Sequence, residues 1–369
     1  MIYKLDKGRL SVELIKVREG KTQLLVPKHE KKIGPKSSQA EIFYNPSMEL
    51  NRDICISFLK TICEGDEILL DGMAASGARG VRIGKEVGCK KVVVNDVDKG
   101  SFELIKKNIE LNNLNNVKPN KEAIEIHLLE NRYKYDYVDI DPFGTPVPYY
   151  SPAVKSVSNR GVIAVTSTDT APLCGTYTKV CQRRYSSTPV NNWCCHEIGL
   201  RILVGFCVRE AARYDKSATP LLSYYNGHHF RTYLKIREGA KRGNRAIDNL
   251  DTFYFDDLGW YEEEDKCGEK WRKAGPLWSG DLFSKKILKR MEPLGKLDED
   301  MISLWLSECE MPPFFYDSNT IGSYFKIAPP SMEVLEDEIQ DRGFKTSRTH
   351  FKPTGLKSDI GVEDIKEFF

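Results

Sequence analysis

The chain has 369 residues, and its 55 basic and 53 acidic side chains leave a formal net charge of +2. Its hydrophobic content of 40% is enough to fill the cores of two domains. The sequence lacks the run of about 18 apolar residues that a membrane span needs, and the opening MIYKLDKGRL does not resemble a signal peptide. We therefore expect a cytoplasmic protein with no membrane partner, while the near-neutral charge leaves a polyanionic partner open.

The cysteines are scattered, without a CxxC pair or another zinc-type spacing. They stand at Cys55, Cys63, Cys89, Cys174, Cys181, Cys194, Cys195, Cys207, Cys267 and Cys309. We expect reduced thiols, and neither a disulfide framework nor a metal site. The pair Cys194-Cys195 falls in a mostly apolar helical stretch, where core packing is favoured over redox chemistry.

The first part of the chain predicts a β-hairpin followed by alternating strands and helices. The hairpin pairs residues 11–17 with 22–27 and belongs to an N-terminal β extension of residues 1–40. From Met48 apolar residues recur at helical spacing. Strands are then expected at 67–71, 91–96, 135–141 and 161–168, with helices at 78–88 and 99–113. Continuously apolar strands separated by helices indicate a parallel sheet with both faces covered, the doubly wound α/β arrangement.

A long helix over residues 191–214 and two further strands complete this domain. The strands, 219–226 and 229–237, meet across Gly227-His228, so at least one of them is antiparallel. This addition is typical of the sheet of class I methyltransferases, whereas dinucleotide dehydrogenases usually lack it. An acidic and aromatic stretch from about residue 246 marks a boundary. We expect domains of residues 1–250 and 251–369, the second with helices near 280–291, 298–309 and 331–341.

The segment DGMAASGARG, residues 71–80, follows the first parallel strand and opens a helix. Gly72, Ala74 and Gly77 are small enough for a ligand to approach the backbone N–H groups at the helix start. Arg79 could bind a carboxylate of that ligand. A glycine-rich turn without a ligand is the alternative.

The second strand ends at Asn95-Asp96, about 20 residues further on, where an acid can accept both ribose hydroxyls of a nucleoside. Helix capping is the alternative for Asp96, but Asp98 suits that role better. Val97 lies beside the same acid. The loop and the acid together predict a nucleoside cofactor, without separating a dinucleotide from S-adenosylmethionine.

The segment Asp139-Ile140-Asp141-Pro142-Phe143-Gly144 favours S-adenosylmethionine. Methylation of an amine on a base requires acceptors that hold its N–H groups and turn the nitrogen lone pair toward the donor. The carboxylate of Asp141 and the carbonyl of Pro142 are suitable acceptors, and Phe143 can stack on the base. A capped proline turn would explain the proline and the glycine but not the aromatic ring.

In nearly its whole length the sequence resembles the tRNA (guanine-26) N2-dimethyltransferase family, especially its archaeal members. The shared motifs are FYNP (43–46), NRD (51–53), DGMAASGARGVR (71–82), VNDVD (94–98), DIDPFGTP (139–146), HEIGLR (196–201), GPLWSG (275–280) and SRTHFKPTGLKSD (347–359). The resemblance implies a class I, Rossmann-like methyltransferase domain with an N-terminal β extension and a smaller C-terminal α/β RNA-binding domain. It also implies S-adenosylmethionine as cofactor and two successive methylations of one guanine amine in tRNA.

Carried over by motif, Arg52, Arg79 and Asp96 hold the cofactor, while Asp141, Pro142 and Phe143 hold the guanine. Glu122, near the end of the third strand, matches less well and is a candidate for the adenine amine. Some members carry a zinc-binding cysteine cluster before the GPLW motif. Only Cys267 stands there in this chain, so that zinc site is not expected.

Two other functions stay open on the sequence alone. Amino-group DNA methyltransferases also use an acid-proline-aromatic turn, although they more often carry a second proline. An inactive RNA-binding protein on a methyltransferase scaffold is the second alternative, which the presence of Asp96 and Asp141 disfavours.

Basic segments at 28–36, 235–245 and 342–357 could contact RNA, or could be solvated surfaces. The last carries Arg342, Lys345, Arg348, Lys352 and Lys357 beside aromatic residues. We expect it to bind tRNA phosphates, with Arg348 and Lys352 as the test residues, and we expect a monomer. The alternative is a solvated basic strand, balanced by the acidic residues that follow it.

Overall fold

The structure is a computed structural model, and it describes residues 3–6, 11–28, 42–264 and 271–369. The chain forms two compact units. The first comprises Met1–Pro142, Tyr149–Val165 and Arg290–Glu299, and the second comprises Phe143–Pro148, Thr166–Lys289 and Asp300–Phe369. The sequence analysis divided the chain at residue 250 by function, into a methyltransferase domain and a tRNA-binding domain. That functional division stays a prediction.

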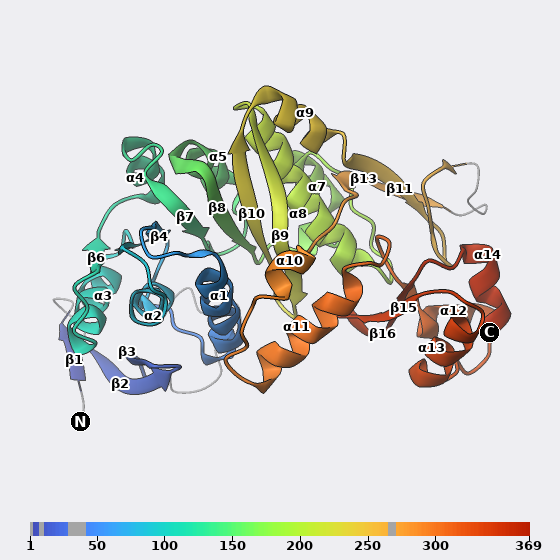
Figure 1. Cartoon of the computed structure of the whole chain (residues 1–369), viewed down its shortest axis with the longest axis horizontal. Coiled ribbons are helices and arrows are strands. Elements are labelled where there is room, and N and C mark those ends of the chain that lie inside the picture. Colours follow the sequence, from blue (N-terminus) through green and yellow to red (C-terminus); the bar gives the residue numbers. More distant parts are fainter. Residues whose placement is uncertain (1–2, 7–10, 29–41, 265–270) are drawn as a thin grey trace. The chain divides into compact units, whose positions relative to one another are not determined.

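A parallel sheet forms the centre of the first unit (Figure 1). Its strands are β4 (Ile68–Asp71), β5 (Lys91–Asn95), β6 (Val117–Asn120), β7 (Tyr135–Ile140) and β8 (Val157–Ser167). Their pairing gives the order β6-β5-β4-β7-β8, with every pair parallel. Strands β4, β5 and β7 are almost entirely buried, as their continuous apolar runs predict.

Helices cover both faces of this sheet. Figure 1 shows α1, α2 and α3 on one side and α4 and α5 on the other. The bounds are η1 (Pro46–Met48), α1 (Glu49–Ile62), α2 (Ala78–Glu86), α3 (Lys99–Leu111), α4 (Ile124–Glu130) and α5 (Val147–Ser156). The alternation of strand and helix, with a parallel sheet between two helical layers, confirms the predicted α/β class.

The N-terminal extension is a small antiparallel sheet of β1 (Tyr3–Asp6), β2 (Ser11–Glu19) and β3 (Thr22–Pro27). It docks on the helices through polar and apolar contacts. The amide of Asn108 in α3 accepts from Leu25 N–H at 2.6 Å and donates to its carbonyl at 3.0 Å, as a partner strand would. Leu14, Leu25 and Leu104 also share one buried cluster. The extension is therefore packed into the first unit.

The parallel register aligns the carboxyl ends of the strands. Asp71 of β4 lies opposite Val94 on one side and opposite Asp139 on the other. Asn95, the last residue of β5, is paired with Asn120, the last residue of β6. The loops that follow these strands consequently emerge at one edge of the sheet, where open α/β sheets bind ligands.

A long buried helix and an antiparallel hairpin form the centre of the second unit. The elements are α6 (Thr170–Leu173), α7 (Thr178–Tyr185), α8 (Cys195–Ala212), β9 (Lys216–Asn226), β10 (His229–Glu238) and α9 (Ala240–Ile247). The hairpin forms as predicted, and Arg231 of β10 donates to the hydroxyl of Thr166 near the end of β8 at 2.7 Å. The sequence analysis missed α9, which buries only Gly243 and Ala246.

Two small antiparallel sheets follow in the same unit. The first has the order β12-β11-β13, from β11 (Leu250–Phe255), β12 (Trp260–Tyr261) and β13 (Arg272–Trp278). The second has the order β14-β16-β15, from β14 (Tyr316–Asp317), β15 (Thr346–Thr349) and β16 (Lys352–Ser358). The remaining elements are α10 (Lys285–Leu288), α11 (Lys296–Glu308), α12 (Ser318–Phe325), α13 (Met332–Asp341), α14 (Val362–Ile365) and η3 (Lys366–Phe368). The helix predicted at 280–291 is thus a single turn, while α11 and α13 match their predictions.

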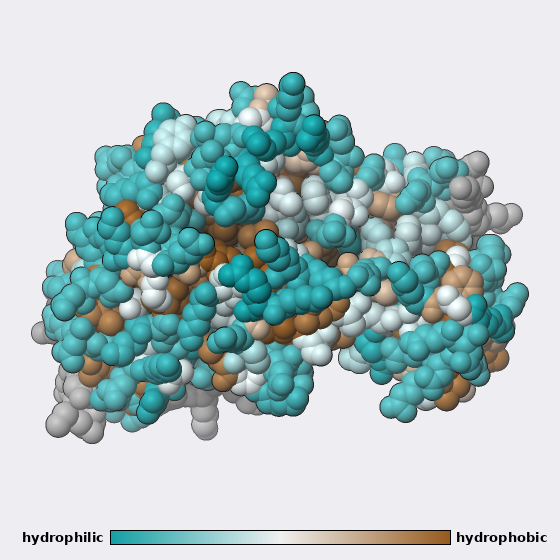
Figure 2. Space-filling view, in the orientation of Figure 1, coloured by the Kyte–Doolittle hydropathy of each residue, from teal (hydrophilic) through white to brown (hydrophobic). Residues whose placement is uncertain are grey.

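The C-terminal α/β portion has an apolar core of its own, which includes Leu335, Ile339, Leu356 and Ile365. This agrees with the predicted smaller α/β region. The face of the molecule in Figure 2 is mostly hydrophilic, with hydrophobic residues confined to smaller patches. Among the described residues, no helix combines the length and the apolar character that a membrane crossing requires.

Candidate active site

The loop after β4 is held against two neighbouring strands. Gly72 N–H donates to the carbonyl of Asp139 at 3.0 Å, and Ala74 N–H donates to the carbonyl of Asn95 at 2.9 Å. A Cβ at Gly72 would lie 2.8 Å from the Asp139 oxygen, so only glycine fits there. Gly77, with φ +77°, has the left-handed conformation just before α2. The predicted small-residue turn is therefore a fixed loop that opens a helix.

Asp96 fastens the same loop from the next strand. Its carboxylate accepts from Ala75 N–H at 2.7 Å and from Asp98 N–H at 2.9 Å. Asp98, as predicted, caps α3 by accepting from Ser101 N–H at 2.7 Å. Val97 between them is 66% exposed. Because Asp98 does the capping, the partly exposed Asp96 carboxylate remains a candidate for the ribose hydroxyls.

The buried side chain of Asn95 joins three loops at this edge, a role that the sequence analysis did not assign. Its amide donates to the carbonyls of Gly72 at 2.9 Å and Glu122 at 3.1 Å. Its oxygen accepts from Asn120 at 2.7 Å and from Glu122 N–H at 3.2 Å. An amide can do this because it both donates and accepts. The only signal in the sequence is its position before Asp96 at the end of a buried strand.

Glu122 lies two residues beyond β6, close to the place expected for it. Its carboxylate contacts Nδ1 of His127 at 3.0 Å, and Nε2 of that ring contacts the Tyr135 hydroxyl at 2.6 Å. This chain of contacts orients Glu122 at the same edge as the loop after β4. Its role toward an adenine amine stays a prediction.

Three carboxylates and one guanidinium meet at the ends of β4 and β7. Arg79 of α2 donates to Asp139 at 3.2 Å, to the amide oxygen of Asn51 at 3.0 Å, and to Asp141. Asp71 accepts from Gly80 N–H at 2.8 Å. Arg79 was expected to bind a cofactor carboxylate; in this structure two carboxylates of the chain itself occupy it, and its role toward the cofactor stays a prediction.

The pKa of Asp71 is shifted by its surroundings in this cluster. Burial raises the pKa of Asp71 to about 7, and the nearby negative charge of Asp139 acts in the same direction. Arg79 opposes the rise without cancelling it. The three carboxylates of the cluster face one guanidinium, and this excess of acids favours a proton on Asp71.

The segment that follows β7 presents an acid and an aromatic ring around a buried proline. The side chain of Asp141 is 24% exposed, Pro142 is buried, and Phe143 is 78% exposed. Phe143 is the first residue of the second unit, and Gly144 after it has φ +85°. Acceptors at Asp141 and Pro142 and a solvent-facing ring at Phe143 are the features that the sequence predicts for holding a planar base.

The second unit anchors the segment beyond Phe143 with residues that the sequence analysis missed. Gly144 N–H donates to the Thr168 hydroxyl at 2.7 Å, and Thr168 N–H donates to the Gly144 carbonyl at 3.0 Å. The hydroxyls of Thr145 and Tyr185 are 2.8 Å apart, and Tyr185 also donates to Asp169 at 3.0 Å. Position after the strand Val157–Ser167 is the only sequence signal for Thr168 and Asp169.

Arg52 lies in α1 and pairs with the N-terminal extension. It is buried and donates to both oxygens of Glu19, at 2.7 and 2.5 Å. Burial favours the protonated form of Glu19, but the contacts with Arg52 lower the pKa of Glu19 overall. The role of Arg52 toward a cofactor stays a prediction.

The basic tail divides into exposed and buried cations. Arg348 and Lys352 are partly exposed, each beside an acid: Glu336 at 3.5 Å and Asp317 at 2.7 Å. Lys357 was predicted to contact tRNA phosphates together with the other cations of this segment, and this prediction was wrong. It is 3% exposed and donates to both oxygens of the buried Glu197, at 2.8 and 2.9 Å. The ammonium group of Lys357 is therefore paired with a buried carboxylate and is not on the surface. Cys267 lies outside the described residues.

Comparison with known proteins assigns the chain to a family. Residues 20–369 match the model of the N2,N2-dimethylguanosine tRNA methyltransferase family. The chain belongs to this family. It is 37% identical to a tRNA (guanine(26)-N(2))-dimethyltransferase from Methanothermobacter thermautotrophicus, over 96% of this chain and 98% of that one. It is 35% identical to the enzyme of the same name from Pyrococcus abyssi, over 95% of this chain and 97% of that one.

The fold of a solved member of the family agrees. Trm1 from Pyrococcus horikoshii, in a complex with S-adenosyl-L-methionine, superposes with a TM-score of 0.86 at 32% identity. The match covers 96% of this chain and 99% of that one. The N2,N2-dimethylguanosine tRNA methyltransferase family thus accounts for nearly the whole chain, and the predicted class I methyltransferase fold is confirmed.

Proposed function

We propose that this chain transfers one or two methyl groups from S-adenosylmethionine to the exocyclic N2 of guanine 26 in tRNA. The observation that carries the proposal is the segment Asp141-Pro142-Phe143, which follows β7 in a chain that matches the methyltransferase family over residues 20–369. The relatives named tRNA (guanine(26)-N(2))-dimethyltransferase support the choice of substrate.

The cofactor is assigned to the edge of the sheet between β4 and β5. There the loop after β4 offers small residues and a helix start, and Asp96 offers a carboxylate to hydroxyl groups. Val97 and Glu122 flank this place, and Arg79 and Arg52 provide the nearby cations. S-adenosylmethionine supplies the methyl group on its sulfonium when it is bound.

The guanine amine is assigned to Asp141 and Pro142. The carboxylate of Asp141 accepts one N–H and the carbonyl of Pro142 accepts the other, so the lone pair of the nitrogen faces the methyl donor. Proline fixes its own φ, which limits the directions in which that carbonyl can point. Phe143 offers an exposed ring on which the base stacks.

The base must leave the tRNA stack to reach this segment, because its amine cannot approach a turn at a sheet edge while the base is paired. The C-terminal region, with Arg348 and Lys352 on its surface, would hold the tRNA by its phosphates. The chain would act as a monomer, and in the cytoplasm, where its substrate is. Sedimentation velocity of the chain alone and with tRNA would test the monomer.

The experiment is to incubate the protein with labelled S-adenosylmethionine and either an unmodified tRNA transcript or a duplex DNA of the same sequence. Nucleoside mass spectrometry should find N2-methylguanosine and N2,N2-dimethylguanosine at position 26 of the tRNA and no product in the DNA. A transcript with adenosine at position 26 is the matched control. Label in the DNA alone would favour the DNA methyltransferase, and cofactor binding without turnover would favour the inactive RNA-binding protein.

A further inference from the structure

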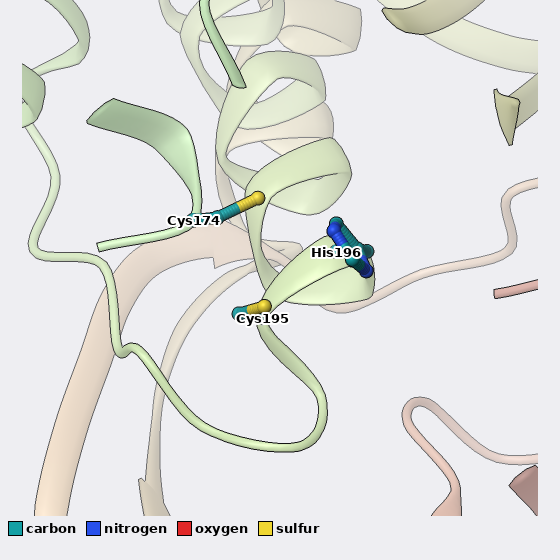
Figure 3. Close-up of side chains that lie close together, drawn as sticks. All are labelled: Cys174, Cys195 and His196. Atoms are coloured by element: carbon teal, nitrogen blue, oxygen red, sulfur yellow. The ribbon is translucent and has the colours of Figure 1, made fainter. Parts of the chain in front are cut away.

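Three potential metal ligands meet in the second unit. The sulfur atoms of Cys174 and Cys195 and a ring nitrogen of His196 all lie within 4.8 Å of one another. Figure 3 shows the three side chains gathered at the beginning of α8. Cys174 directly follows α6, while Cys195 and His196 are the first two residues of α8. Cys195 follows Cys174 by 21 positions, which is not the close pair of a typical zinc motif, so sequence spacing did not reveal the cluster.

The backbone fixes the distance between these ligands. Gly175 has φ +92° and lies close to the backbone just before α8. A Cβ at Gly175 would be 2.6 Å from the backbone nitrogen of Asn191. On α8, a Cβ at Gly199 would lie 3.1 Å from the carbonyl oxygen of Leu173. Both contacts are with backbone atoms, which cannot move aside easily. Two glycines therefore allow the end of α6 to pack tightly on α8, and the ligand positions are preorganised.

The ligand side chains are held as well. The ring of His196 stacks on Tyr225, with centroids 4.2 Å apart and an angle of 12°. Cys174 is buried, and Cys195 and His196 are partly buried. A partly open cluster with two soft sulfur ligands and one imidazole suits a thiophilic ion, and leaves space for a fourth ligand such as water.

We propose that Cys174, Cys195 and His196 bind one Zn²⁺ ion through two thiolates and one imidazole. Two thiolates balance the charge of the divalent ion. Binding releases the thiol protons to solvent and changes no oxidation state. Its ligands are at other places in the sequence than the cysteine cluster that some family members carry before the GPLW motif.

The ion would stabilise the segment that supports the acid-proline-aromatic loop. Cys174 follows Thr168 and Asp169 by only a few residues, and these two hold Gly144 and Tyr185. Zinc would tie this segment to the first turn of α8. The role is structural, and it does not depend on which base the protein methylates.

The test begins with the full-length chain, stripped with a chelator under reducing conditions and then dialysed with Zn²⁺. Elemental analysis should find one zinc per chain. With Co²⁺ in its place, the sulfur-to-cobalt charge-transfer absorption should report the two thiolates. Cys174→Ser, Cys195→Ser and His196→Ala should each weaken Zn²⁺ binding by at least about tenfold, as measured by competition with a chromophoric chelator.

Cys309→Ser is the matched control, because it removes another partly buried thiol from the same unit. It should bind Zn²⁺ as the wild type does. Circular dichroism separates a lost ligand from a lost fold, and His196→Ala tests the site without changing a thiol. Less than about 0.1 zinc per reconstituted chain, wild-type affinity in all three variants, or a Cys174–Cys195 disulfide under reducing conditions would overturn the proposal. Retention of Cu⁺ but never of Zn²⁺ would overturn the choice of ion.

Discussion

The guanidinium of Arg79 contacts the carboxylate of Asp141, and the same side chain also binds Asp139 and Asn51. Arg79 is buried, whereas Asp141 is partly exposed. The pair therefore leaves part of the Asp141 carboxylate accessible while its orientation is fixed from behind. An acceptor held in this way needs little reorganisation when a substrate amine arrives.

The first prediction concerns Asp141. Asp141→Ala should slow methyl transfer by about 100- to 1,000-fold, which is a barrier higher by about 2.7 to 4 kcal/mol, as expected when one preorganised polar group is removed. S-adenosylmethionine affinity should stay within about tenfold, since the carboxylate is assigned to the guanine. Initial rates and calorimetry measure the two effects. Asp141→Asn keeps the shape and one acceptor, and should retain more activity; wild-type rates in Asp141→Ala would refute the assignment.

Cofactor affinity should depend on Asp96. Asp96→Ala removes an acceptor assigned to two ribose hydroxyls, each bond worth about 1.5 to 3 kcal/mol, and also releases Ala75 N–H. Calorimetry with S-adenosylmethionine should show the loss. Asp98→Ala is the matched control, because it removes the helix cap next door, which costs about 1 kcal/mol of stability, and should leave cofactor affinity unchanged. Equal affinities for S-adenosylmethionine in the wild type, Asp96→Ala and Asp98→Ala would refute the assignment of Asp96 to the ribose hydroxyls.

The ring of Phe143 should matter for rate with saturating tRNA. Base stacking on an aromatic ring contributes about 1 to 3 kcal/mol, so Phe143→Ala should slow single turnover by about fivefold or more. Tyr324→Ala removes another exposed ring of the second unit and should have no effect. Fluorescence of 2-aminopurine placed beside position 26 follows extrusion of the base. A Phe143→Ala protein that reacts as fast as the wild type leaves the ring without a stacking role.

The tail should supply affinity for tRNA. The double variant Arg348→Ala, Lys352→Ala should weaken tRNA binding and make the slope of log affinity against log salt shallower by about 1 to 2, since each lost phosphate contact lowers it by about 0.7 to 0.9. S-adenosylmethionine binding should not change. Arg132→Ala with Lys134→Ala removes the same charge from the first unit and is the control. An unaltered slope in the tail variant would favour the solvated strand.

Asp71 should make stability depend on pH. The folded state raises the pKa of Asp71 to about 7, so the folded protein binds a proton that the unfolded chain releases near pH 4. Stability from this group is present at low pH and is lost as pH rises toward 7. Urea unfolding should show a decline of at least about 1.4 kcal/mol between pH 5 and pH 8 that Asp71→Asn removes. Asp66→Asn, at an exposed position, is the control and should show the same decline in the free energy of unfolding as the wild type. A decline that persists in Asp71→Asn would contradict the prediction.

Much of the first unit could be predicted, because its strands β4, β5 and β7 are short, continuously apolar and buried, and because helices alternate with them along the chain. The Asp98 cap and the small residues Gly72 and Gly77 are local features, so sequence alone locates them. Asp141 and Phe143 could be proposed for a similar reason, since they are adjacent residues directly after a strand, and their roles stay predictions.

What escaped prediction depends on contacts between distant segments. Asn95 looked like an ordinary strand end until it contacted Gly72 and Glu122. Lys357 looked like one more surface cation, and only the structure pairs it with Glu197, 160 residues earlier. The helix α9 was missed because it is short and its buried face consists of the small residues Gly243 and Ala246. The cluster at Cys195 was missed because its ligands come from two segments of the chain.

The ion pairs of Glu19 also bear on the order in which the chain is assembled. Its partners Arg52 and Arg82 follow it by 33 and 63 residues, so during synthesis the carboxylate emerges well before either arginine. A carboxylate resists transfer out of water until an opposite charge is in place. The turn of the hairpin must therefore stay hydrated while α1 and α2 are being made. The turn between β2 and β3 therefore reaches its final position only after the two helices that follow it in the chain have been made.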